Sequence, residues 1–105
     1  MLLGDIAHDR TGDKGDISQI TVIVYDSVDY DILRERVTVG RVLAHFKNLE
    51  VRVAHRYEMN EIGALNFVLE GALKGGVTRA LALDAHGKTL GAQLLDMDIG
   101  AQERV

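Results

Sequence analysis

The chain has 105 residues, 47% of them hydrophobic and 27% charged, and its 12 basic and 16 acidic residues give a net charge of −4 at pH 7. This length and composition predict one globular domain over residues 1–105, and a negative charge without a basic stripe disfavours binding to nucleic acid. The absence of cysteine excludes disulfides and thiolate catalysis, and the lack of a signal peptide or a long apolar run favours a cytoplasmic protein without a membrane partner.

The first half of the chain reads as two strands followed by two helices. Residues 2–8 and 17–25 are predicted strands, the second a central strand because β-branched residues occupy both of its faces. A loop at residues 9–16 is expected between them. Asp29 and Thr38 are expected to cap a short helix around DYDILRER and a second helix after it, since each precedes an apolar helical stripe.

The second half alternates in the same way. Residues 51–59 have period two and predict a half-exposed strand. Residues 61–74 are predicted to form a helix, which would direct the amide of Asn66 toward the sheet, where it needs a hydrogen-bond partner. Two final strands are expected at residues 78–84 and 89–99, joined by a tight turn.

Strands that alternate with helices and end in a hairpin indicate an α+β, two-layer sandwich with a mostly antiparallel sheet. The preferred topology is ferredoxin-like, with an extra N-terminal strand and two to three helices on one face of the sheet.

The stretch HDRTGDKGD, residues 8–16, is the main candidate for a site. Its glycines permit a tight turn that exposes backbone N–H groups, and Arg10 and Lys14 suit a carboxylate or phosphate ligand. Three aspartates, however, give the Asp/Lys/Arg groups of the stretch a net charge of −1, and a solvated turn explains the composition equally well.

Other kinds of site are less well supported. A calcium loop fails because its turn glycine would fall at Lys14 and its final acid at Ile20, and a P-loop lacks the required spacing. We therefore expect no metal. His8 and His55 could act as acid, base or ligand, although half-buried histidines more often have structural partners. No serine has the context of a nucleophile, and whether the chain is an enzyme stays open.

Three segments together resemble the C-terminal domain of the acyclic terpene utilisation protein A (AtuA) family. They are DIAHDRTGDKGD, GALNFVLEGALKGGVTRALALDAHGKTLG and LLDM, and the resemblance covers nearly the whole chain. It implies a ferredoxin-like fold, a bacterial origin and a link to the degradation of acyclic terpenes or branched acyl chains as CoA thioesters. The residues that carry over as ligand-binding candidates are His8, Arg10, Gly12, Asp13, Lys14, Gly15, Asp16 and Asn66.

In typical AtuA proteins this module follows a much larger domain. The resemblance therefore implies a separate large AtuA-type subunit as partner, with this chain as an accessory subunit or ligand-binding module. The alternative is an independent small acyl-CoA-binding protein or enzyme, for which self-association is also expected. A CoA thioester would be the ligand in that case, and no other cofactor is expected.

Overall fold

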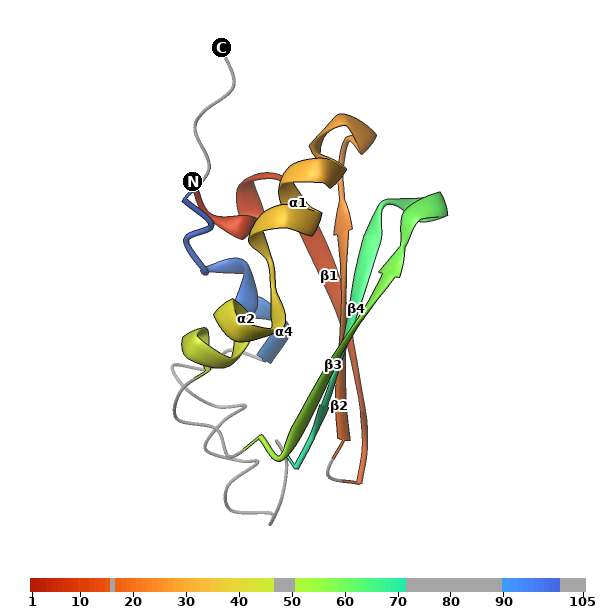
Figure 1. Cartoon of the computed structure of the whole chain (residues 1–105), viewed down its shortest axis with the longest axis vertical. Coiled ribbons are helices and arrows are strands. Elements are labelled where there is room, and N and C mark those ends of the chain that lie inside the picture. Colours follow the sequence, from red (N-terminus) through yellow and green to blue (C-terminus); the bar gives the residue numbers. More distant parts are fainter. Residues whose placement is uncertain (16, 47–50, 72–89, 101–105) are drawn as a thin grey trace.

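The computed structural model describes residues 1–15, 17–46, 51–71 and 90–100. In these residues a four-stranded antiparallel sheet carries helices on one face (Figure 1). The strands are β1 (Ala7–Lys14), β2 (Ile17–Val24), β3 (Val53–Met59) and β4 (Ala64–Glu70), in the order β1-β2-β4-β3. The helices are α1 (Tyr30–Arg36), α2 (Val39–His45) and α4 (Leu90–Leu95), with 3-10 turns η1 (Leu3–Asp5), η2 (Ser27–Asp29) and η3 (Asn60–Ile62).

The topology is ferredoxin-like. Strand β2, the helices α1 and α2, and strand β3 form a split β-α-β unit, because β4 lies between β2 and β3 and pairs antiparallel with both. The N-terminal strand β1 pairs antiparallel with the other side of β2. The predicted α+β sandwich, with an extra N-terminal strand and its helices on one face, is therefore confirmed.

The hydrophobic core lies between the helices and the inner face of the sheet. Strands β2 and β4 alternate, so that every second side chain points inward. The largest fully buried side chains are Leu3, Ile20, Val22, Leu33, Val37, Val42, Leu65, Phe67, Leu69, Leu90, Leu94 and Ile99. The outer face of the sheet is not covered by any described helix, and we call it the open face.

The predicted cap of the second helix is confirmed, and that of the first is wrong. The backbone N–H of Arg41 donates to Thr38 Oγ1 over 3.2 Å at the start of α2. Asp29 is buried and makes no such cap to α1. Instead Asp26 accepts a hydrogen bond from the backbone of Val28 and starts the preceding turn η2. Because η2 leads directly into α1, the capping residue of the helical path is Asp26, three residues before the predicted cap.

The prediction of a strand at residues 2–8 and a loop at residues 9–16 is wrong. A 3-10 turn occupies the first of these stretches, and β1 runs through most of the second. Gly15, with φ at 63°, begins the short turn into Ile17, and Asp16 lies outside the described residues. Polar side chains suggested a loop, but an edge strand with one open face accepts them at alternate positions.

The helix predicted at residues 61–74 is also wrong, because β4 occupies most of this segment. Gly63, with φ at 66°, closes the turn that joins β3 to β4. The apolar residues of LNFVLE fit both a helical stripe and a period of two. Pairing with β2 on one side and β3 on the other decides for the strand. Residues 72–74 lie outside the described residues.

Strand β3 confirms the strand predicted at residues 51–59, but its apolar side faces outward. Val53 and Tyr57 lie on the open face, whereas Arg56 points toward the helices. Its Nη1 donates to the carbonyl oxygens of Arg34, over 2.7 Å, and Val37, over 2.9 Å. The guanidinium thus satisfies carbonyls at the C-terminal end of α1, where the helix provides no partner.

The strand predicted at residues 89–99 is wrong as well, since α4 takes up its first half. The chain then returns to the N-terminus, where the backbone N–H of Leu3 donates to Met97 over 2.8 Å and that of Ile99 to Met1 over 3.0 Å. The strand predicted at residues 78–84 lies outside the described residues.

Candidate functional site

The extended conformation of β1 separates the charges of the candidate stretch. Successive side chains of a strand point to opposite faces. Arg10 and Lys14 therefore lie on the open face, while Asp9 and Asp13 point to the helix side. In a loop these charges would mix to a net charge of −1. In the strand the basic residues lie on one face and the acidic residues on the other.

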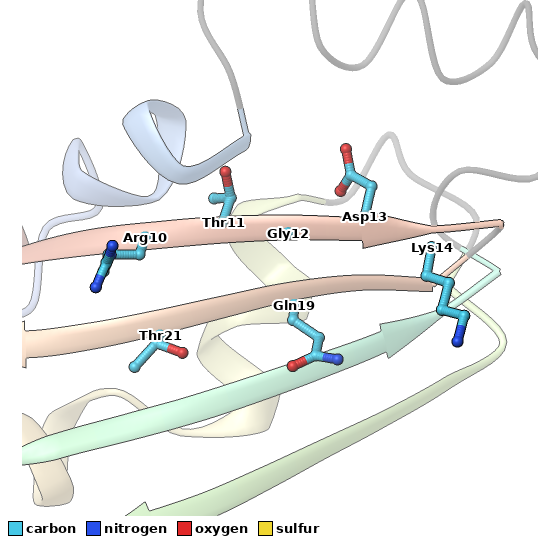
Figure 2. A pocket seen from close by; sticks show the side chains of 7 residues that line it. All are labelled: Arg10, Thr11, Gly12, Asp13, Lys14, Gln19 and Thr21. Carbon is cyan, nitrogen blue, oxygen red and sulfur yellow. The ribbon is translucent and has the colours of Figure 1, made fainter.

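A shallow hollow of about 310 Å³ lies on β1 and β2 around these bases. It is lined by Arg10, Thr11, Gly12, Asp13, Lys14, Gln19 and Thr21. Figure 2 shows Arg10, Lys14, Gln19 and Thr21 leaving the strands on one side, and Thr11 and Asp13 on the other. The side chains that face the two cations are consequently neutral hydrogen-bonding groups, and no carboxylate is among them.

Gly12 forms the floor of the hollow. It lies on the open face opposite Gln19, between Arg10 and Lys14 along the strand. A Cβ atom built at this position would meet no atom of the described residues within 4 Å. Glycine in a strand costs about 0.5–1 kcal/mol relative to alanine and often marks close approach of a ligand or another chain. Because no contact with the described part of the chain requires glycine here, its effect is to leave the hollow open.

Asn66 supports the hollow from the neighbouring strand β4. Its Nδ2 donates to Thr21 Oγ1 over 2.8 Å. The expectation that this amide needs a partner is met, although on a strand rather than on a helix. Since the Thr21 oxygen accepts this bond from the β4 side, its own O–H is left to donate on the side of the hollow that it lines.

The two histidines singled out in the sequence lie outside the hollow and far from each other. His8 stacks on Tyr25, with ring centroids 5.1 Å apart. His55, on β3, has its Nε2 3.6 Å from Glu70 Oε2 and stacks on Tyr57 at 6.1 Å. Among the other candidates, Gly15 belongs to the turn. The structure therefore brings together only part of the predicted set.

Thr11, within the stretch itself, was not among the candidates, and two further lining residues, Gln19 and Thr21, were missed by the sequence analysis. Both belong to β2, which was considered only as a core strand. The signal was present in principle, because a tight turn after Lys14 fixes the register of a hairpin and places Gln19 opposite Gly12. This register was not considered because residues 9–16 were assigned to a loop.

Asp9 is the unusual group on the other side of β1. Its Oδ2 is buried and has no hydrogen-bond partner among the described residues. Burial raises the pKa of this carboxyl from 3.8 to about 6, and the charge of His8 lowers it in part. Helix α4 lies directly against it: a Cβ atom at Gly91 would come within 2.9 Å of Asp9 Oδ1 and 2.6 Å of Thr11 Cγ2.

No group of three or more histidine and acidic side chains in the described part of the chain is placed to hold a metal ion. Asp9 and Asp13 also cannot share one, because four residues of extended strand separate their Cα atoms by about 13 Å. Among the helices of the described ranges, none has the length and apolar character needed to span a membrane.

Comparison with known families identifies the family to which this fold belongs. Residues 1–100 match the family model of the AtuA ferredoxin-like domain. The chain belongs to this family. The match covers nearly the whole chain, and it includes both the strand that carries Arg10 and Lys14 and the strand that carries Asn66. No curated protein and no solved structure matches this AtuA ferredoxin-like domain.

Proposed function

We propose that this AtuA ferredoxin-like domain is an accessory subunit or ligand-binding module that acts with a separate large AtuA-type subunit. Its open face would pack against that subunit, and the hollow would complete a ligand site between them. The pathway would be the catabolism of acyclic terpenes or branched acyl-CoA compounds. One observation carries this proposal. Arg10 and Lys14 lie on either side of Gly12, which has no side chain, and no carboxylate faces these two cations across the hollow.

The exposed apolar residues of β3 support an interface on the same face. Tyr57 is 53% exposed, Met59 40% and Val53 38%, although each lies in a regular strand. Exposed apolar and aromatic groups that gather on one surface are typical of protein–protein interfaces. On the open face these apolar residues lie on the edge strand β3, and the basic residues lie on β1 at the opposite edge.

The chemistry of the hollow favours binding over catalysis by this chain alone. Arg10 and Lys14 are permanent cations at neutral pH, and Gln19 and Thr21 are neutral. The lining contains one carboxylate, that of Asp13, which points to the other side of β1, and it contains no histidine and no activated nucleophile. Any reaction at this site would need groups from the partner.

Co-purification tests the proposal. The chain is expressed together with a large AtuA-type protein encoded in the same genome, and we expect the two to elute as one complex. Tyr57→Glu on the open face should abolish the complex, whereas Arg34→Gln, on a helix at the opposite side of the sheet, should leave it intact. Elution of the two proteins apart at cellular concentrations would contradict the proposal.

The second candidate function is an independent small acyl-CoA-binding protein, with self-association through the sheet. The hydrogen-bond donors beside the cations favour it, since a CoA phosphate accepts such bonds. Calorimetric titration of free CoA and short branched acyl-CoA into the purified chain and into Lys14→Ala tests this function. Absence of heat, or equal binding by the variant, would exclude it.

A further inference from the structure

We propose that the hollow holds a small extended molecule with two oxyanion groups, one bound by Arg10 and Thr21 and the other by Lys14, its middle lying over Gly12. This inference rests on the proposed ligand-binding function and names the chemistry of its ligand. The reasons come from the two ends of the hollow, its middle and its charge.

The first end is prepared by a hydrogen-bonded row across three strands. Arg10, Thr21 and Asn66 are neighbours in register, from β1 through β2 to β4. Asn66 occupies the Thr21 oxygen from one side, so the hydroxyl proton is left to donate to another acceptor, and Arg10 is the register partner of Thr21 on β1. A planar guanidinium together with an oriented hydroxyl matches the acceptor oxygens of a carboxylate or phosphate.

The second end is separate from the first. Arg10 and Lys14 are four residues apart on an extended strand, which places their Cα atoms about 13 Å apart. Figure 2 shows their side chains diverging, with Gly12 and Gln19 between them. One small anion does not reach both charges in this arrangement. A molecule with an anionic group at each end does.

The middle of the hollow sets the shape of the ligand. Gly12 presents only backbone, and Gln19 opposite it offers an amide. A volume of about 310 Å³ is at the small end of the range for ligand pockets. The space therefore suits a small ligand whose middle lies over the backbone of Gly12.

Neither cation is neutralised by the described protein. Arg10 and Lys14 form no ion pair with a described residue. Glu70 of β4 is aligned with Lys14 of β1 across the sheet, but Ile17 of β2 lies between them. The Oε2 of Glu70 is instead 3.6 Å from His55 Nε2. Both ends of the hollow thus remain available to anions.

Titration of the isolated chain, followed by amide NMR shifts at low ionic strength, tests the inference. Acetate is the probe with one carboxylate, and glutarate and suberate have two carboxylates at increasing distance. Hexane-1,6-diyl bisphosphate replaces the two carboxylates by phosphates. Suberate or the bisphosphate should bind at least about five-fold more tightly than acetate, with shifts at both ends of the hollow, since two weak ion pairs add. The tighter of these two probes identifies the oxyanion. Equal affinity for all probes, or no shifts at any of them, would overturn the inference.

Paired variants locate the binding. Thr21→Val removes the hydroxyl and should weaken suberate binding about three- to ten-fold, whereas Thr21→Ser should retain it. Gly12→Val should block suberate but leave acetate binding at Arg10 unchanged. Arg34→Gln is the control for the loss of a distant cation. Equal binding by the Thr21→Val and Thr21→Ser variants would refute the assigned donor.

The two proposals fail separately. A complex with the large subunit, without binding of any dianion, would contradict only the ligand chemistry. Dianion binding by a chain that never joins a large subunit would contradict only the accessory role.

Discussion

Replacing Asp9 by asparagine should stabilise the fold at neutral pH. The raised pKa, from 3.8 to about 6, means that the folded protein favours the neutral acid. As the pH rises from 3.8 to about 6, the unfolded chain loses this proton more readily than the folded one, so the free energy of unfolding falls. Above that window the whole cost is present, and below it the cost disappears.

The size of the effect follows from the shift and the burial. A shift of about two units corresponds to at most about 3 kcal/mol. The carboxyl is only half-buried, and solvent screening should reduce the cost to about 1 kcal/mol. Asparagine has the same shape without the charge, so Asp9→Asn should raise the melting temperature by about 4–8 °C at neutral pH.

Thermal unfolding is followed by circular dichroism from about pH 3.5 to about pH 7.5. It measures both the gain in melting temperature and the pH dependence of that gain. The stabilisation should vanish at the acid end of this range. Asp13→Asn removes an exposed carboxylate from the same face of the same strand and should change the melting temperature little. A gain of equal size at every pH, or the same gain from both variants, would refute burial of the Asp9 charge as the cause.

Three further substitutions test the packing around the site by denaturant unfolding. Gly91→Ala should destabilise the fold by about 1–3 kcal/mol, because its Cβ would lie 2.6 Å from a methyl carbon of β1; an unchanged midpoint would show that α4 does not pack there. Arg56→Gln should cost about 2–3 kcal/mol, since it leaves two carbonyls at the end of α1 without their donor, and a loss below about 0.5 kcal/mol would contradict this role. Gly12→Ala should leave stability unchanged or raise it by about 0.5 kcal/mol, whereas clear destabilisation would mean that the fold itself needs this glycine.

The candidate stretch shows how residues singled out from the sequence can be placed in the wrong local structure. Glycines and charges in HDRTGDKGD favoured a loop, and its composition then gave an unhelpful net charge. As a strand, the same residues separate into Arg10 and Lys14 on one face and Asp9 and Asp13 on the other. An edge strand needs few apolar residues, so propensity alone could not reveal it.

The assignment of β4 failed for a different reason. Residues of LNFVLE satisfy a helical stripe and an alternating pattern at once, and a short apolar run does not distinguish them. The neighbouring strands decide that this segment is a strand, because β4 pairs with β2 on one side and with β3 on the other. This also moves Asn66 from an expected helix to the row that orients Thr21.

The sequence by itself determined the family, the fold class, the central strand β2 and the first two helices, because these depend on local periodicity, caps and a recognisable combination of segments. Tertiary structure alone decided which side of the sheet each charge occupies and that Gly12 opens a hollow beside Thr21 and Gln19. The physical reason is that strand register and the covering of one face by helices are set by pairing between distant segments, and a shift of one residue would exchange the two faces.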